Sequence, residues 1–507
     1  MPDISRRTIL RSGAFTAAAV LTTRIAGQPG VARAADSDLQ VAYNDLVITP
    51  HAPPWPSLWM SGYGWGKRSN NGAVARDLRA HCVVFHDSGS PNVLLRLDVV
   101  GIPRDVHQEI RRRVVEEEQL VADSDFMISV SHTHSGPCVG DTHLDPFIMM
   151  GLDPADIDAV NGSTYMLMDV LVDLVRTTVQ EDPADATLHY GVGQAELGRN
   201  RAGLDWVLTD VPVLLVRNGD NGDPFAVLFG YACHPVSRGI DSVFDSDFTG
   251  AAAEIIEDRL GIMALFFQGL AGDQEPVGDK GPGLVEELGD GLAQAVIDVV
   301  EQDDLTQVTG PFRTAITEVD LPLALDLTDD DVVADLRDRY QERLDDNGAP
   351  DYLRRHAQVI VDRIDAGALE ASIPMPMQVW HVAGLTIVAL AHEVLSTFDL
   401  LIRQLGEELG VGNLWIMSYA NETQCYVAAD DKLWIGGYEA GWTDDPSIVG
   451  DGTSTMVYGW ASPLRSSPPG TDPAAPDATE TVVLAGCREL LTQVTRDTLS
   501  RARTRST

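Results

Sequence analysis

Two histidines separated by one residue are the most informative chemical feature of the chain. His132 and His134 lie within residues 131–137, directly after the short apolar run of residues 126–130. That run predicts a buried strand, so both histidines would follow its carboxyl end, where open α/β sheets place their ligand sites. Side chains two residues apart on an extended chain point to the same side, and both imidazoles can therefore reach one small volume. Such a pair is either part of a metal site or two hydrogen-bonded histidines of the core.

Two other apolar runs also end in residues that can bind a metal. His234 follows residues 225–231, and Glu393 follows residues 385–391. The His-Glu pair that contains Glu393 is not the His-Glu-x-x-His helix of metalloproteases, because Ser396 stands where the second histidine belongs. A lone histidine at a strand end is more often structural, but imidazole and carboxylate are both ligands that zinc accepts. We therefore expect a metal site if the sheet brings these strand ends together.

The elements that must position these residues alternate between strands and helices. Apolar runs and period-two patterns predict strands, and apolar residues at helical spacing predict helices. The expected strands are residues 82–85, 93–97, 126–130, 211–216, 225–231, 262–267, 385–390 and 414–417; the expected helices are residues 104–117, 165–179, 253–260 and 479–503, with a charged helical region at 329–366. This alternation predicts an α/β fold of layered mixed β-sheets flanked by helices. Residues 462–477 are the only linker-like stretch and no internal repeat is visible, so we expect one large catalytic domain over residues 35–507.

Residues 1–34 have the three parts of an export signal. Ser5-Arg6-Arg7-Thr8-Ile9-Leu10 carries a twin arginine, residues 13–21 are apolar, and Ala32-Arg33-Ala34 offers the small residues that a signal peptidase prefers. A basic, amphipathic first helix is the alternative. We expect twin-arginine export to a secreted or extracytoplasmic location. No later run reaches the roughly eighteen apolar residues of a membrane span, so any contact with lipid would be peripheral.

The composition is strongly acidic. The formal net charge is −40, and the only lysines are Lys67, Lys280 and Lys432. Nucleic acid is therefore excluded as a partner. The charge is typical either of a protein that stays hydrated at high salt or of a genome that depletes lysine. The five scattered cysteines lack the paired spacing of a zinc ribbon and predict buried thiols, with room for one bridge in an exported protein.

Four ordered motifs together resemble the neutral/alkaline, non-lysosomal ceramidases. They are Ser131-His132-Thr133-His134-Ser135-Gly136-Pro137, Ala232-Cys233-His234-Pro235, Gln268-Gly269-Leu270-Ala271-Gly272-Asp273 and residues 426–439. The resemblance implies an exported amidohydrolase of sphingolipid metabolism that acts on a ceramide-like lipid or a related N-acyl compound. The chain ends about 70 residues after Tyr438, so the resemblance covers the catalytic domain without the family's C-terminal immunoglobulin-like domain.

The same resemblance assigns roles to individual residues. It implies one Zn²⁺ with four ligands: His132, His234, Glu393 and Tyr426. It places His134 and Tyr438 opposite the scissile carbonyl and Arg201 in contact with the substrate, although Arg199 is equally near in the sequence. Zinc lowers the pKa of a bound water to about 7 and polarises a carbonyl, so the implied chemistry is hydrolysis of a linear amide.

Glu275 marks the main departure from the family pattern. It replaces a serine in Gly272-Asp273-Gln274-Glu275-Pro276, and it is a general base, a receptor for a cationic substrate group or a solvated loop residue. Cys138 stands where the family has glycine, and Ala391-His392-Glu393 replaces Pro-Gly-Glu. Two alternatives to ceramide hydrolysis therefore stand: a related hydrolase of a non-lipid amide or ester, and a non-catalytic binding protein that contains the metal. No Gly-x-Ser-x-Gly and no phosphate-binding loop is found, which disfavours serine-hydrolase and nucleotide-dependent chemistry.

Overall fold

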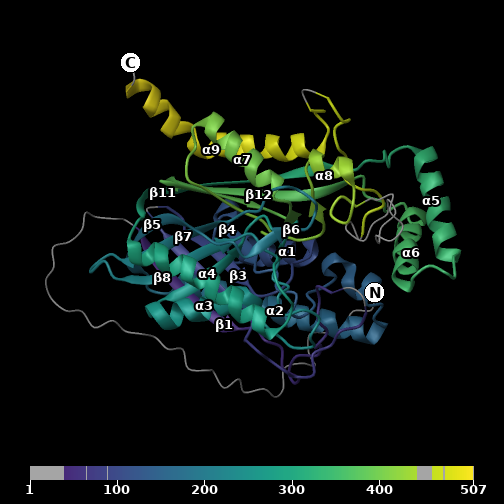
Figure 1. Cartoon of the computed structure of the whole chain (residues 1–507), viewed down its shortest axis with the longest axis horizontal. Helices are drawn as coiled ribbons and strands as arrows, with labels where there is room; N and C mark the ends of the chain where they lie inside the picture. Colours follow the sequence, from purple (N-terminus) through teal and green to yellow (C-terminus); the bar gives the residue numbers. More distant parts are fainter. Residues whose placement is uncertain (1–38, 64–65, 88, 442–458, 472–473, 506–507) are drawn as a thin grey trace.

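Twelve strands form one mixed β-sheet within the described part of the chain, which comprises residues 39–505 without 64–65, 88, 442–458 and 472–473 of this computed structural model (Figure 1). The path through the sheet is β15-β13-β12-β11-β5-β1-β2-β3-β4, and β7, β8 and β9 extend it from β5. Its strands are β1 (Gln40–Val47), β2 (Arg79–His86), β3 (Asn92–Leu97), β4 (Phe126–Val130), β5 (Ala184–Gln194), β7 (Asp210–Asn218), β8 (Pro224–Tyr231), β9 (Met263–Gln268), β11 (Thr306–Pro322), β12 (Ser372–Ala383), β13 (Leu385–Leu390) and β15 (Leu414–Met417). Two short pairs lie apart from it: β6 (Gly198–Asn200) with β10 (Gln274–Pro276), and β14 (Glu393–Val394) with β16 (Tyr426–Val427).

Three strand pairs of the large sheet are parallel: β3 with β4, β8 with β9, and β13 with β15. The other pairs of the large sheet are antiparallel in the described residues. Because the carboxyl ends of parallel strands meet at one edge, each parallel pair brings two loops to the same place. The segments that carry His132, His234 and Glu393 follow β4, β8 and β13 at these three edges.

The two halves of the sheet face each other across a central apolar cluster. Inward side chains of β2–β4 and β7–β9 meet those of β12, β13 and β15, including Trp380 and Trp415. Along β2, Val83 and Phe85 point into this cluster, whereas alternate residues such as Cys82 point outward to the helices. The result is a layered arrangement of helices, sheet, sheet and helices.

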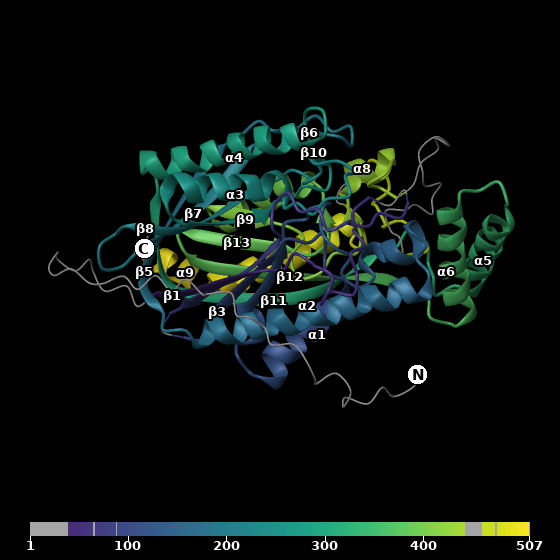
Figure 2. The ribbon, with the colours of Figure 1, turned by 90° about the horizontal axis from the view of Figure 1, so that it is seen from below.

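Helices cover both outer faces (Figures 1 and 2). α7 and α9 lie over β11 and β12, α1 and α2 pack on β1–β3, and α3 and α4 pack on β7–β9. The helices are α1 (Arg104–Arg111), α2 (Pro154–Gln180), α3 (Asp247–Leu260), α4 (Pro282–Gln302), α5 (Asp330–Asp345), α6 (Asp351–Asp365), α7 (Thr397–Leu409), α8 (Asp430–Ile435) and α9 (Thr479–Arg505). The predicted fold class, layered mixed sheets flanked by helices in one α/β domain, is confirmed.

The helices and strands differ from the predictions in length and number. The charged region 329–366 is a hairpin of α5 and α6, because Gly348 and Pro350 interrupt the helix with a turn. The long strands β5 and β11 were not predicted, because many of their side chains are partly exposed or polar and form no continuous apolar run. β12 was not predicted either: most of its residues are buried, but Pro374 and Pro376 are unusual within a strand. The beginning of the linker-like stretch pairs with the end of β11 and the residues that follow it: the amide of Arg465 donates to the carbonyl of Pro322, and the buried Leu464 bridges to Leu323.

Other expectations concern the cysteines, the membrane and the export signal. All five cysteines are buried as free thiols. Among the described residues, no helix combines the length and hydropathy needed to cross a membrane. The proposed export signal, residues 1–34, lies outside the described residues.

Candidate metal centre

Three histidines and a glutamate converge where the three parallel strand pairs end. One ring nitrogen from each of His132, His134 and His234 lies within 4.8 Å of the other two. The Oε2 atom of Glu393 lies 3.2 Å from Nε2 of His132 and 3.2 Å from Nε2 of His234. These residues are far apart in the sequence, and the sheet topology alone brings them together.

His132 reaches the group by a route that the sequence did not predict. β4 ends at Val130, and His132 adopts a left-handed backbone with φ of 65° rather than the extended form. The same-face argument from strand geometry is therefore wrong for this pair. The bend is held by the loop that follows the parallel neighbour β3, because the amide of His132 donates to the carbonyl of Val99 at 3.1 Å and Nδ1 faces the carbonyl of Val100.

Left-handed backbone recurs around the group. His392 has φ of 70° and Tyr419 has φ of 57°, and the amide of Tyr419 donates to the carbonyl of His392 at 3.0 Å. Non-glycine residues held in this region carry strain that surrounding contacts must offset, and such residues cluster at functional sites. The strain is thus local evidence for a site at these loops.

His134 lies against the other two imidazoles. Its Nε2 is 3.1 Å from Nε2 of His132, and its amide donates to the carbonyl of Pro235 in the loop that carries His234. Gly62 covers the ring so closely that a Cβ at that position would stand 2.8 Å from the imidazole. The segment around Gly62 therefore fixes where this ring can lie.

His234 and Glu393 are held by the loops after β9 and β15. Nδ1 of His234 donates to the carbonyl of Ala271 at 2.6 Å, which leaves Nε2 as an acceptor that faces Glu393. Gly272 follows directly, and a Cβ there would stand 2.8 Å from the carbonyl oxygen of Glu393. The Gly272-Asp273 motif thus permits close approach of two backbones, and the buried Asp273 carboxylate accepts from the amide of Ser396 at 2.9 Å.

Two tyrosines complete the group. The Tyr426 hydroxyl lies 3.2 Å from Nε2 of His234 and accepts a hydrogen bond from Arg201 at 2.9 Å. Tyr419, which we did not predict as a site residue, donates to Glu393 at 3.4 Å. Tyr419 carried no signal in the sequence, because a tyrosine next to an apolar run cannot be told from a core residue.

Of the two candidate arginines, Arg201 lies beside the group. Its guanidinium also donates to the carbonyl of Gly272 at 2.9 Å and pairs with the buried Glu439 at 3.0 Å. Arg199 is 64% exposed and pairs with Glu275, its partner in the β6–β10 register. The Tyr438 ring lies 5.8 Å from the Tyr426 ring, measured between centroids.

Burial keeps His134 and His234 neutral and so keeps their lone pairs available. Burial and then the Arg201 guanidinium lower the pKa of His234 to about 3, and burial with the neighbouring histidines lowers the pKa of His134 well below its usual value. Burial and the Glu393 carboxylate raise the pKa of Tyr426. Burial opposes the charge of Arg201, but Tyr426 and Glu439 together raise its pKa. The group therefore combines neutral imidazoles, one carboxylate and a phenol beside a permanent cation.

The spacing of these donors fits a tetrahedral metal ion. Four ligand atoms about 2.0–2.1 Å from zinc, at the corners of a tetrahedron, lie about 3.3 Å from one another. The distances from Glu393 to His132 and His234, and from Tyr426 to His234, are each 3.2 Å. Without a cation, unprotonated nitrogen and carboxylate lone pairs would face each other at this range. The donor set therefore fits a metal.

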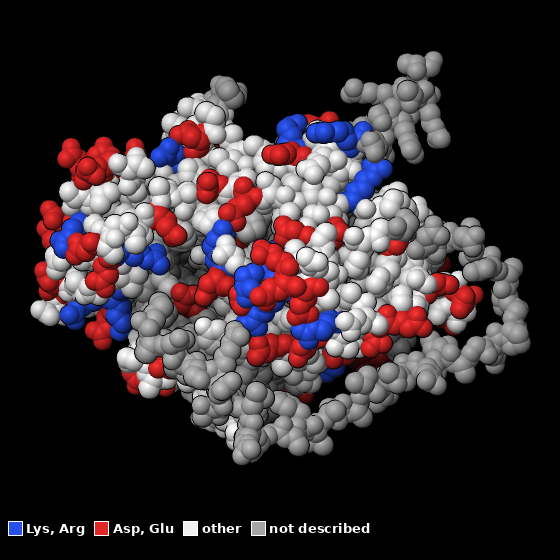
Figure 3. Space-filling view, turned by 180° about the vertical axis from the view of Figure 1, so that it is seen from behind, with Lys and Arg blue, Asp and Glu red and all other residues white. Residues whose placement is uncertain are grey.

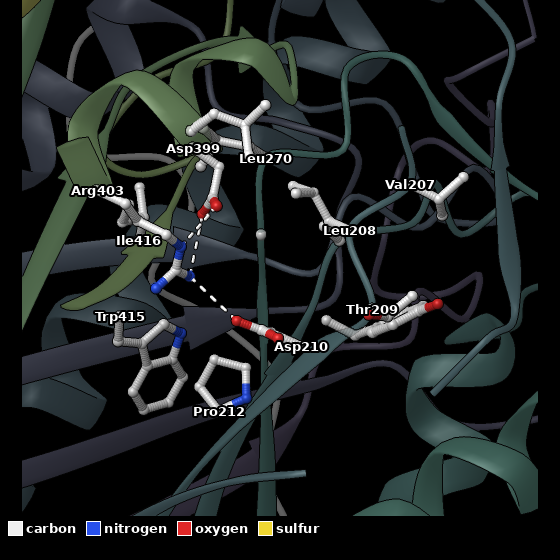
Figure 4. Close-up of a pocket in the computed structure, with 14 residues that line it drawn as sticks. Val207, Leu208, Thr209, Asp210, Pro212, Leu270, Asp399, Arg403, Trp415 and Ile416 are labelled. Atoms are coloured by element: carbon white, nitrogen blue, oxygen red, sulfur yellow. Dashed lines mark hydrogen bonds and ion pairs between the residues drawn. The ribbon is translucent and has the colours of Figure 1, made fainter. Parts of the chain in front are cut away.

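A separate cavity of about 230 Å³ lies behind the strand that leads to His234 (Figure 4). Its walls include Trp415 and Pro212, and Arg403 is held between Asp399 and Asp210. None of the predicted site residues lines it, and its carboxylates are already paired with the guanidinium. This cavity is accordingly not part of the metal centre.

Solved structures of ceramidase share this architecture. The crystal structure of neutral ceramidase from Pseudomonas aeruginosa aligns with a TM-score of 0.61 at 17% identity, over 84% of this chain and 73% of that one. The chain has the neutral ceramidase fold. A structure described as ceramidase complexed with C2 aligns with a TM-score of 0.59 at 16% identity, over 84% and 74% of the two chains. No protein-family model and no curated protein sequence matches the chain. The resemblance drawn from the four motifs is thus confirmed at the level of the fold.

Proposed function

We propose that this protein is a zinc-dependent amidohydrolase that cleaves the N-acyl bond of a ceramide-like lipid or a related N-acyl compound. One observation carries the proposal: within a ceramidase fold, Glu393 lies 3.2 Å from the Nε2 atoms of both His132 and His234. In the proposed site these three residues and Tyr426 hold Zn²⁺. The bound ion would supply a nucleophilic water at neutral pH and polarise the substrate carbonyl.

The chain's own residues orient the reacting groups. Nδ1 of His132 faces the Val100 carbonyl, so Nε2 carries the lone pair directed into the site. Nδ1 of His134 is buried with no hydrogen-bond partner among the described residues, which favours placing the proton on Nε2. That N–H faces the site and would donate to the carbonyl oxygen of the substrate as negative charge develops there, a contribution of about 3 to 4 kcal/mol in well-studied cases.

Arg201 and Tyr438 act around the same point. Arg201 donates to the hydroxyl of Tyr426 and thereby favours its phenolate form, which burial alone disfavours. Tyr438 stacks edge-on against Tyr426 and is the second candidate donor to the substrate carbonyl. Arg201 is then a positioning residue, because its contacts are to protein groups.

Glu275 favours a second candidate, a related hydrolase of a different amide or of an ester. Its carboxylate pairs with Arg199 across the antiparallel β6–β10 strand pair, so it stands in an ion pair rather than as a bare general base. This ion pair would suit a different substrate group from the one that contacts a serine hydroxyl at the same position. The binding-protein alternative predicts the metal without turnover.

Metal analysis and a substrate panel test the proposal. We expect about one zinc per chain, and hydrolysis of N-acyl amides that falls at least about 100-fold in His132→Ala and Glu393→Ala as the metal is lost. His189→Ala, a histidine on β5 bonded to Thr187, is the matched control and should keep both zinc and activity. Zinc-free purified protein, or full activity in His132→Ala, would refute the proposal; stoichiometric zinc with no amide or ester cleaved would favour the binding protein.

Export of the protein by its twin-arginine segment is a further part of the proposal. Fusion of residues 1–34 to a reporter that folds before translocation should direct that reporter out of the cytoplasm. Replacement of Arg6 and Arg7 by lysine should retain it inside, whereas export that persists in that variant would count against the assignment.

A further inference from the structure

Two of the three lysines lie beside residues that contact the metal centre: Lys432 next to Arg201, and Lys280 over the Tyr63 ring. Lys67 lies with its Nζ 5.9 Å from the centre of the Trp59 ring, and Lys432 donates to the carbonyl of Ala202, next to Arg201. Lys280 lies with its Nζ 5.8 Å from the centre of the Tyr63 ring. These are all the lysines in a chain whose net charge is −40. Figure 3 shows how acidic side chains are spread over one face, with basic side chains standing beside them.

Lys280 is connected to the reacting group through one aromatic ring. Tyr63 packs edge-on against His134, with the ring centres 5.2 Å apart, and carries Lys280 over its ring. The Tyr63 hydroxyl donates to the carbonyl of Val236, two residues after His234. The Lys280 ammonium therefore stands at the rim of the site, beyond the ring that contacts His134.

The positive charge at this rim is not fully compensated. Glu275 has the largest attractive effect on the Lys280 ammonium, followed by the buried Asp247, but Glu275 already pairs with Arg199. In the described part of the chain, the Lys280 ammonium makes no hydrogen bond and no ion pair. Burial lowers the pKa of Lys280, which Glu275 opposes. An anion brought to this point would meet a cation that, among the described residues, contacts the Tyr63 ring but is not directly paired with a carboxylate.

Apolar side chains flank the same cation. Val277 is 54% exposed and Ile240 is 73% exposed, and a Cβ on Gly239 would touch the Cβ of Lys280 at 3.4 Å. The rim thus offers exposed aliphatic surface beside one uncompensated positive charge. An anionic amphiphile complements both features, whereas a neutral lipid headgroup uses only the first.

We propose that Lys280 selects substrates in which the N-acyl compound carries a carboxylate near the amide, so that the preferred substrate is anionic rather than a neutral ceramide. The inference rests on the proposed amidohydrolase function and narrows its substrate class. Long-range repulsion by the −40 chain disfavours anions over most of the surface, so local cations at the rim decide whether one is accepted.

A matched pair of amides tests this. N-lauroyl-4-aminobutyrate carries a carboxylate where N-(4-hydroxybutyl)lauramide carries a neutral hydroxymethyl group. We expect the unmodified enzyme to favour the carboxylate by about tenfold in kcat/KM, the value of one charge-assisted contact. Lys280→Ala should abolish that preference, mainly through a higher KM for the carboxylate, and leave the neutral amide unchanged. Lys280→Arg should retain it, and Lys67→Ala is the control that should behave as the unmodified enzyme.

Each result decides a different claim. Equal cleavage of the two amides, or a preference that persists in Lys280→Ala, overturns the anion inference and leaves the amidohydrolase intact. If neither amide is cleaved, the hydrolase proposal fails for these compounds. Calorimetric binding of the same pair to the unmodified protein and to Lys280→Ala then decides the charge preference: tighter binding of the carboxylate that is lost in the variant supports it, and equal binding overturns it.

Discussion

Replacement of Arg201 by methionine should separate the stability of the site from its function. Arg201 makes an ion pair with Glu439 at 3.0 Å and donates to the Gly272 carbonyl and the Tyr426 hydroxyl at 2.9 Å each. Methionine keeps much of the volume but leaves Glu439 buried, with a side chain only 4% exposed. Loss of one partner of a buried pair costs about 3 to 5 kcal/mol. Lys432, whose Nζ lies 3.5 Å from the Glu439 carboxylate, compensates part of that loss, so we expect the free energy of unfolding to decrease by about 3 kcal/mol.

Urea denaturation and chelator competition provide the two measurements. We expect Arg201→Met to lower the free energy of unfolding and to weaken metal affinity by about 10- to 100-fold, because Tyr426 loses the donor that favours its phenolate. The double variant Arg201→Met/Glu439→Gln removes the unpaired charge and should recover much of the stability. Its metal affinity should stay low, because the donor to Tyr426 is still missing. Full stability in the single variant, or recovered metal affinity in the double variant, would show that this account of Arg201 is wrong.

Three further outcomes follow from the geometry. The folded-state pKa of His234 is about 3 and its unfolded value is about 6.5, so the unfolded chain binds the extra proton and the contribution of His234 to stability should fall by up to about 1.4 kcal/mol per pH unit as pH drops from about 6.5 toward 3. The pKa of His134 is lowered as well, so urea titrations at pH 7, 6 and 5 should show at least this slope, and His234→Gln should reduce it by the share of one histidine. Gly272→Ala places a Cβ 2.8 Å from the Glu393 carbonyl oxygen, so it should lower the free energy of unfolding by about 1 to 3 kcal/mol and reduce metal content. Gly283→Ala, whose Cβ enters open space, should change neither, and thermal unfolding with metal analysis measures both. Glu275→Ser should leave metal content unchanged and alter only relative kcat/KM values across a panel of amides, and an unaltered ranking would remove Glu275 from substrate recognition.

The buried carboxylates of the site are each matched by nearby side chains. Glu393 lies between the imidazoles of His132 and His234, and Glu439 is held by Arg201 and Lys432. The negative charge that keeps the outer surface hydrated is thus offset locally by cations. A site with this balance can hold a divalent ion and still present positive charge at its rim.

Local sequence patterns were sufficient for the elements that are apolar throughout. The runs that became β4, β8 and β13 are buried along their length, and such runs are visible without knowledge of the fold. The order of the motifs also indicated the ceramidase fold. By contrast, β5 alternates buried with partly exposed side chains and β11 exposes many of its side chains, so neither strand forms the continuous apolar run by which β4, β8 and β13 were recognised.

The sequence by itself determined which residue types were available: His132, His234 and Glu393 at strand ends, followed by motifs that resemble a known family. Only the tertiary structure decided how they meet. A hydrogen bond from its amide to the carbonyl of Val99, in the loop after β3, holds His132 in a left-handed conformation. Arg201 contacts Tyr426, whereas Arg199 pairs with Glu275. Both outcomes depend on contacts between segments distant along the chain, which no local pattern encodes.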